Sequence, residues 1–287
     1  MYKQLQSLLN TRVQQCVSTK EGSCKKIEKK KELLSKRNGE IVKADAKGYV
    51  RDKITDDDHT VILYEVHFRY FIKQKSSFYM EEEIEKREAV FYHDTLLKDE
   101  EMEMFHETES LPIRKFDSDE NKRIRYVYDR RQAVQYAERW WNSYNPKYIK
   151  FEVDCTNFVS QCLHAGGAPM RGYPVKSKGW WMQNKSWSYS WSVANALRWY
   201  LGTSNTGLRA KEVQDPVDLK LGDVICYDFQ GDGRFDHCTI VTAKDANGMP
   251  LVNAHTTNSR MRYWSYEDST AYTKNIQYKF FSIVDDA

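Results

Sequence analysis

The chain of 287 residues carries 44 Lys and Arg against 41 Asp and Glu, which gives a formal net charge of +3. That charge is too small to indicate a nucleic-acid partner, and no apolar run approaches the roughly 18 residues of a membrane span, so neither is expected. The length allows two domains with a sizeable core. The sequence begins without a basic-then-apolar leader, which predicts a cytoplasmic protein; the alternative is a cell-envelope protein whose leader has been trimmed.

Residues 1–110 are expected to form a small α+β accessory domain. Apolar residues recur at helical spacing from Leu5 to Val13, and the lysine-rich stretch Lys25–Lys36 carries apolar residues of its own, which together predict a helix or a helical pair. The basic run of this stretch is typical of a solvated helix face. Residues 41–93 then alternate with period two, which predicts antiparallel strands after the helices.

The second domain is expected to span residues 128–287, after a linker at residues 111–127. The surrounding stretch Asp94–Asn121 is strongly acidic and poor in apolar residues, which favours a linker with at most a short helix. The domain then opens with an amphipathic helix from Tyr128 to Trp141, and Asn145-Pro146 ends it.

A cysteine at the start of a helix is the central feature of the second domain. A short apolar strand ends at Val153, Asp154 is placed to be the N-cap, and Cys155 falls in the first turn. Gly166-Gly167 ends this helix. Unpaired N–H groups and the positive end of the helix dipole should favour the thiolate, which is the nucleophilic form. The same position also fits a buried structural cysteine.

A histidine at the start of a later strand supplies a candidate base. Two strands are predicted at residues 236–242 and 251–256, and His237 lies at the start of the first of them. Because side chains alternate along a strand, Asn253 and His255 share one face of the second strand. Either could orient the imidazole, so the spacing leaves a Cys-His-Asn and a Cys-His-His triad open.

Motifs in this domain occur in the order found in one known family, which they resemble: Asp154-Cys-Thr-Asn-Phe-Val-Ser-Gln-Cys-Leu-His-Ala-Gly-Gly167, Gly179-Trp180-Trp181, Leu221-Gly-Asp-Val224 and Asp236-His237. The family is the putative amidase domain family, and the resemblance covers roughly residues 128 to 270. This family is similar to the papain-fold NlpC-like and CHAP hydrolases, which cleave amide bonds in peptidoglycan peptides. The resemblance therefore implies a papain-like (NlpC-like) α+β cysteine hydrolase domain.

The resemblance also implies roles for individual residues. Cys155 would be the nucleophile and His237 the base. NlpC-like enzymes carry a polar residue in the strand after the histidine strand, which indicates Asn253 as the third residue. The His255-Thr256 pair also resembles the family, so His255 stays the alternative. The substrate would be a peptidoglycan-derived peptide or glycopeptide, hydrolysed through a thioester without cofactor or metal.

Further residues are candidates for binding the substrate. The backbone N–H of Cys155 is expected to stabilise the oxyanion, and Tyr148 is a candidate for the second donor. Trp180 and Trp181 are expected on a loop, where they could line a groove. No short Cys-x-x-Cys pair occurs, which argues against zinc, whereas Cys226 and Cys238 lie on strands that could be bridged. The alternative function is a non-catalytic cell-wall-binding or protein-interaction module that retains the fold.

Overall fold

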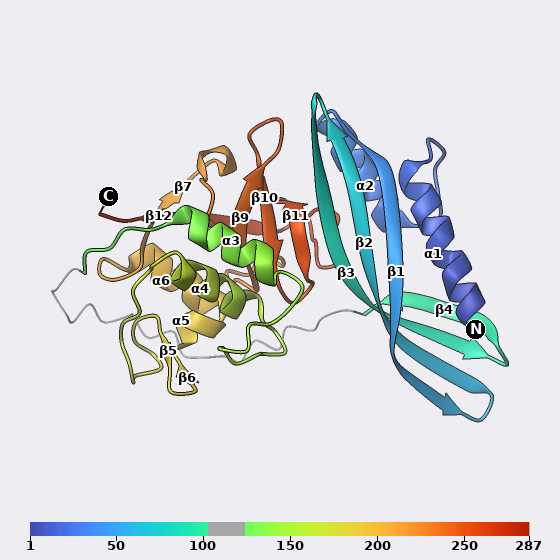
Figure 1. Ribbon diagram of the computed structural model, residues 1–287, viewed down its shortest axis with the longest axis horizontal. Helices are drawn as coiled ribbons and strands as arrows, with labels where there is room; N and C mark the ends of the chain where they lie inside the picture. The colour runs from blue at the N-terminus through green and yellow to red at the C-terminus, as the bar shows by residue number, and fades with distance from the viewer. Residues whose placement is uncertain (103–123, 287) are drawn as a thin grey trace. The chain divides into compact units, whose positions relative to one another are not determined.

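The structure, a computed structural model, describes residues 1–102 and 124–286. The chain forms two compact units, each a mixture of α-helices and antiparallel strands, so the α+β class expected from the sequence is confirmed (Figure 1). Unit 1 comprises Met1–Met104 and Thr257–Ala271, and unit 2 comprises Phe105–Thr256 and Tyr272–Ala287. No helix of the described residues combines the length and the apolar composition that crossing a membrane requires.

Unit 1 consists of two helices and an antiparallel sheet. Its elements are α1 (Tyr2–Val17), α2 (Lys25–Lys36), β1 (Gly39–Asp56), β2 (His59–Gln74), β3 (Ser77–Tyr92), β4 (Thr95–Glu101) and β11 (Ser259–Tyr263). The strands β1, β2 and β3 lie side by side in chain order, and both β4 and β11 pair with β3. The helical pair and the period-two strands predicted for this part of the chain are therefore confirmed.

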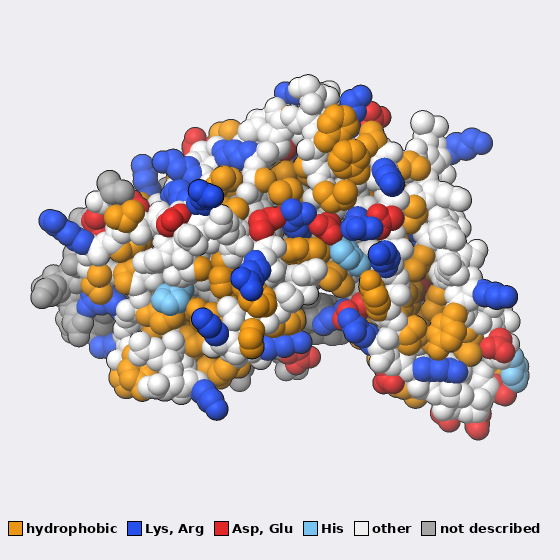
Figure 2. All heavy atoms as spheres, in the orientation of Figure 1, with side chains coloured by type: hydrophobic (Ala, Val, Ile, Leu, Met, Phe, Trp, Pro, Cys, Tyr) orange, Lys and Arg blue, Asp and Glu red, His pale blue; other side chains and the backbone are white. Residues whose placement is uncertain are grey.

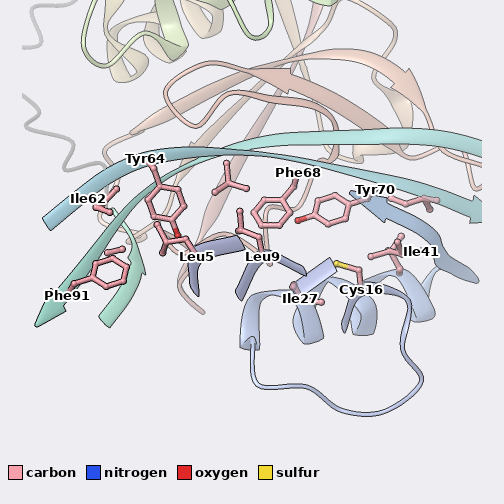
Figure 3. Close-up of a cluster of buried hydrophobic side chains, with 14 residues drawn as sticks. Leu5, Leu9, Cys16, Ile27, Ile41, Ile62, Tyr64, Phe68, Tyr70 and Phe91 are labelled. Carbon is pink, nitrogen blue, oxygen red and sulfur yellow. The ribbon is translucent and has the colours of Figure 1, made fainter. Parts of the chain in front are cut away.

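A single apolar cluster holds the helices of unit 1 on its sheet. Alternate residues of β2 are buried, as the period-two pattern predicts. Figure 3 shows Leu5 and Leu9 of α1 and Ile27 of α2 facing Phe68 and Tyr70 of β2. Burial of one such side chain stabilises a fold by about 1.5–3 kcal/mol, so this contact fixes both helices on one face.

The segment Thr257–Ala271 joins unit 1 although it lies late in the chain. Its strand β11 pairs with β3, and its Asp268 accepts a hydrogen bond from Lys30 of α2, with Nζ 2.6 Å from Oδ2. Both side chains of this ion pair are almost completely buried. The segment is therefore tied to unit 1 by strand pairing and by a buried ion pair.

The two units differ from the two consecutive domains that the sequence predicts. An uninterrupted second domain was expected over residues 128–287, whereas residues 257–271 cluster with unit 1. The predicted linker at 111–127 lies mostly outside the described residues. Part of the acidic stretch taken as linker, Thr95–Glu101, is instead the strand β4, so that interpretation is wrong there. Its Asp99 accepts hydrogen bonds from two arginines, which offsets the acidic charge of the strand.

Unit 2 places two helices against a five-stranded sheet. Its elements are α3 (Arg130–Trp140), α4 (Cys155–Ala165), β5 (Met182–Gln183), β6 (Ser186–Trp187), α5 (Tyr189–Ser192), α6 (Ala194–Thr203), β7 (Arg209–Val213), the 3-10 turn η1 (Pro216–Asp218), β8 (Val224–Asp228), β9 (His237–Lys244), β10 (Pro250–Ala254) and β12 (Gln277–Val284). The strand order is β10-β9-β8-β12-β7, and every pairing is antiparallel. The helices α3 and α4 pack on each other and on β9.

The helix α4 is the central helix of unit 2. Nine consecutive residues from Cys155 to Leu163 are buried, including its polar side chains. Gly166 follows the helix and Gly167 adopts a φ of 92°, which confirms the predicted stop. The nucleophile candidate is thereby held by a helix that is enclosed on all sides.

Candidate active site

The sulfur of Cys155 lies at the N-terminus of α4, against the beginning of β9. Sγ is 4.0 Å from the backbone oxygen of Asp236 and 3.7 Å from the hydroxyl of Thr156. His237 follows Asp236 directly in the chain. The tertiary structure therefore places the predicted nucleophile next to the backbone of the residue that precedes the predicted base, although 81 residues separate Cys155 from Asp236.

Burial keeps the Cys155 thiol neutral in this structure. Cys155 is 1% exposed, and burial raises the pKa of its thiol to about 12. Hydrogen bonding from the Cys238 backbone and from the Thr156 and Thr256 hydroxyls lowers the pKa, but by less. The helix dipole had predicted a shift in the opposite direction. Loss of water around a charged sulfur acts against the dipole, and in this structure the pKa is raised.

His237 is buried at the start of β9, where it pairs with Tyr227 of β8. Its ring lies 5.6 Å from the ring of Tyr227 and 6.1 Å from that of Phe229, measured between centroids. The Cys155 N–H donates to Oγ1 of Thr256 at 3.2 Å, and the sulfur lies beside the Thr156 hydroxyl and the backbone oxygen that precedes His237. The backbone that carries His237 therefore adjoins the Cys155 sulfur.

His255 forms a buried pair with Asp154, the residue that precedes the nucleophile. Nδ1 of His255 is 2.7 Å from Oδ2 of Asp154, and Nε2 is 2.8 Å from the backbone oxygen of Trp140. The ring stacks on Phe158, with 4.0 Å between centroids. Because both ring nitrogens are engaged, His255 does not orient His237 in this structure. It anchors the start of α4 instead.

Asn253, the other candidate for the third position, bonds across to different partners. Its Nδ2 donates to Oε1 of Glu138 at 2.8 Å, and its Oδ1 accepts from the hydroxyl of Thr242 at 2.9 Å. Asn253 stands opposite Ile240 in the sheet, three residues along β9 from His237. These bonds link β10 to β9 and α3.

The Asp154 carboxylate does not cap α4 in the way the sequence predicts. Asp154 occupies the N-cap position but makes no side-chain bond to the helix N–H groups. Its Oδ1 accepts instead from the backbone N–H of Phe151 and from Nδ2 of Asn157, both at 2.9 Å. The other oxygen is held by His255. The carboxylate is therefore turned away from the helix end.

A hydroxyl that the sequence did not single out takes over this capping role. Oγ1 of Thr256 accepts from the backbone N–H of Asp154 at 3.1 Å and from that of Cys155 at 3.2 Å. The N–H expected to stabilise an oxyanion is thus engaged with Thr256. The only signal in the sequence was its adjacency to His255, because nothing local predicts that this residue folds back onto α4.

Trp180 and Trp181 do not line a groove. Both rings are 0% exposed, and the indole N–H of Trp180 donates to the hydroxyl of Ser160 at 2.9 Å. The expectation is corrected because no ring area is left to contact a ligand, so both residues pack the core of unit 2. Tyr148 is partly buried, and its ring stacks on Trp191 with 6.0 Å between centroids.

Tyr144 is an accessible aromatic side chain near the residues that hold the start of α4. Tyr144 is 36% exposed, and its ring meets the His255 ring edge-on at 5.0 Å. Nζ of Lys150 stands 4.1 Å from the centroid of the Tyr144 ring. A partly exposed aromatic ring with a lysine above it therefore adjoins the residues that hold the nucleophile.

All six cysteines are free thiols in the structure. Cys226 and Cys238 face each other across β8 and β9, with 3.4 Å between their sulfurs. The pair that the sequence suggested as a bridge is thus a thiol–thiol contact.

Comparison with known proteins identifies relatives of both units. Residues 127–281 match the family model described as "Putative amidase domain", which confirms the resemblance drawn from the motifs. "Uncharacterized protein YhbB" of Bacillus subtilis is 53% identical over 274 residues, covering 92% of this chain and 88% of YhbB. "Uncharacterized protein YjcM" of the same organism is 37% identical over 135 residues, covering 44% of this chain and 30% of YjcM. No solved structure matches the chain.

Proposed function

Because the chain belongs to the putative amidase domain family, we propose that it hydrolyses amide bonds with Cys155 as the nucleophile. The family description suggests amide hydrolysis, and one geometric observation supports the choice of residue. The Cys155 sulfur lies at the head of α4, next to the backbone that carries His237. A helix N-terminus packed on an antiparallel strand that begins with histidine is also the arrangement expected of a papain-like hydrolase.

The neutral thiol defines what the base must do. Since the thiol carries its proton at neutral pH in this structure, His237 would take that proton as the sulfur attacks the carbonyl carbon. The imidazolium would then give the proton to the leaving nitrogen as the C–N bond breaks, which leaves a thioester on Cys155. A water molecule, deprotonated by His237, would release the acid and restore the thiol.

These reaction steps require the His237 ring to lie within hydrogen-bond reach of the Cys155 sulfur when a substrate is bound. Catalytic hydrogen bonds are often long or poorly aligned without substrate and tighten in the complex. The oxyanion would be stabilised by the Cys155 backbone N–H at the helix start. The pair of His255 and Asp154 would keep this helix end in place, rather than orient the base.

The proposed substrate is a peptide from peptidoglycan, as the family resemblance implies. Two lysine–aromatic pairs would suit a peptide that carries carboxylates. Lys150 stands over Tyr144, and Lys176 stands over Trp187 with 5.1 Å between Nζ and the ring centroid. Phe151, three residues before Asp154, packs edge-on against Trp187. Other Lys and Arg side chains are scattered over the face drawn in Figure 2, so the attraction would be local.

The test is hydrolysis of wall-derived peptides by the full chain, followed by mass spectrometry of the released amine. Cys155→Ala should abolish turnover while its unfolding midpoint stays close to wild type. Cys162→Ala is the matched control, because Cys162 lies on the same helix and is buried away from its start; it should stay active. Turnover by Cys155→Ala would refute the proposal. Binding of the peptides by the wild type without any cleavage would favour the non-catalytic module.

A further inference from the structure

Thr256 is the residue that satisfies the start of α4. The first N–H groups of a helix have no partner within the helix, and here Phe158 is the first to bond back, to the Asp154 carbonyl. The N–H groups of Asp154 and Cys155 both donate to Thr256 Oγ1 instead. The hydroxyl thus holds the nucleophile and the residue before it through one oxygen.

The backbone of Thr256 supports a special role for this position. Thr256 has a φ of 78°, in the left-handed region, which is unfavourable for a β-branched residue. Such conformations persist only where surrounding contacts impose them, and they gather at functional sites. The contacts are present here, because His255 is fixed by Asp154 and Trp140 directly before the strained residue.

The hydroxyl also has one proton left to donate. Having accepted two N–H groups, Thr256 Oγ1 can direct its own hydrogen towards the Cys155 sulfur. The Thr256 hydroxyl is one of the groups that lower the pKa of the Cys155 thiol against the larger effect of burial. The hydroxyl of Thr156, 3.7 Å from the sulfur, is another. Two hydroxyl groups therefore stabilise negative charge on the atom that becomes the thiolate in the proposed reaction.

Building on the proposed function, we propose that Thr256 is the positioning residue of the nucleophile. Its hydroxyl sets the position of the Cys155 backbone and donates to the sulfur as His237 removes the thiol proton. When an oxyanion takes over the Cys155 N–H, the N–H of Asp154 still holds the hydroxyl in place. The two acceptor bonds thus allow one to be exchanged during the reaction without releasing Thr256.

The experiment measures the rate at which iodoacetamide alkylates Cys155 in the full chain between pH 7 and 10, by peptide mass spectrometry. Thr256→Val keeps the shape and removes the hydroxyl; hydrogen bonds to charged groups are strong enough that alkylation should slow about tenfold at each pH. Thr256→Ser retains the hydroxyl and should stay within about twofold of wild type. Should T256V fail to fold, Thr256→Ala takes its place with the same expectation.

An unchanged or faster alkylation in a folded T256V or T256A protein would overturn the proposal, as would a Ser variant as slow as the Val variant. With a cleavable peptide, kcat should fall in T256V and recover in T256S, while KM changes little. The alkylation assay needs no substrate. Slowed alkylation in T256V, together with a wild type that cleaves no amide, would therefore refute the amidase proposal and leave the role of Thr256 standing.

Discussion

The imidazole of His255 and the carboxylate of Asp154 form a buried pair immediately before the proposed nucleophile, with 2.7 Å between Nδ1 and Oδ2. Both side chains are almost completely enclosed, at 3% and 1% exposure. The pair connects the end of β10 to the start of α4, and the Trp140 carbonyl closes the other side of the ring. A residue expected to act on the base thus acts on the helix that carries the thiol.

Breaking this pair is expected to destabilise the protein strongly. Asp154→Asn or His255→Gln would leave one buried polar partner uncompensated, which typically costs about 3–5 kcal/mol. Urea unfolding should show this loss in each single variant, and the double variant should lose less than the sum. Glu152→Gln is the matched control, because Glu152 is exposed two residues away and should change the free energy of unfolding by less than about 0.5 kcal/mol. A loss below about 1 kcal/mol in both single variants would contradict the pairing.

The raised pKa of Cys155 predicts a specific pH dependence of stability. The folded thiol has a pKa of about 12, whereas an unfolded cysteine titrates near 8.5, so the unfolded state loses its proton first as the pH rises. The contribution is complete below about pH 8.5 and is lost as the pH rises towards the folded pKa. From pH 9 to 10 the wild type should lose about 1.2 kcal/mol of unfolding free energy relative to Cys155→Ala. Identical pH profiles for the two proteins would show that the thiol is not buried in this way.

The same shift in pKa predicts that Cys155 reacts more slowly with alkylating reagents than Cys24 does. Alkylation of Cys155 in the wild type should be slow at pH 7 and still rise at pH 10, because little thiolate is present. Half-buried Cys24 should react faster, and provides the internal reference within one sample. Mass spectrometry of peptides after timed labelling gives both rates. Faster labelling of Cys155 than of Cys24 at pH 7 would support the thiolate that the helix position alone predicts.

Lys30 is expected to be essential for the stability of unit 1. Its side chain is 4% exposed, and its ammonium pairs with both Glu81 and Asp268. Lys30→Met would leave two carboxylates buried without this cation, for an expected loss of about 3–5 kcal/mol in urea unfolding. The control is Lys36→Met on the same helix, because the Lys36 side chain is 62% exposed and its pair with Glu32 should contribute no more than about 1 kcal/mol. Equal effects of the two substitutions would contradict the buried ion pair.

Removing residues 1–123 is expected to destabilise the rest of the chain. A protein that begins at residue 124 keeps the segment Thr257–Ala271 but lacks β3 and Lys30, its partners in unit 1. The segment, which directly follows His255 and Thr256, would expose its strand edge and leave Asp268 with Arg262 as its cation but without Lys30. Thermal unfolding should therefore show a lower midpoint than in the full chain. An unchanged midpoint would indicate that residues 128–287 fold independently, as the sequence suggested.

Local patterns determined much of this protein in advance. Helical spacing and paired glycines predicted the extent of α4, period-two alternation predicted the strand β2, and ordered motifs identified the family. These features depend on residues within one or two turns of each other, so neighbouring side chains and backbone preference suffice. The adjacency of Cys155 and His237 along the fold followed from the family resemblance, not from spacing.

What only the tertiary structure decided is the surroundings of each side chain. The burial that protonates Cys155, the engagement of His255 with Asp154, and the return of Thr256 to the start of α4 join positions about a hundred residues apart. The capture of residues 257–271 by unit 1 is a pairing of the same kind. Desolvation and hydrogen-bond partners depend on which distant segments come into contact. Residue type and spacing within one segment do not predict those contacts.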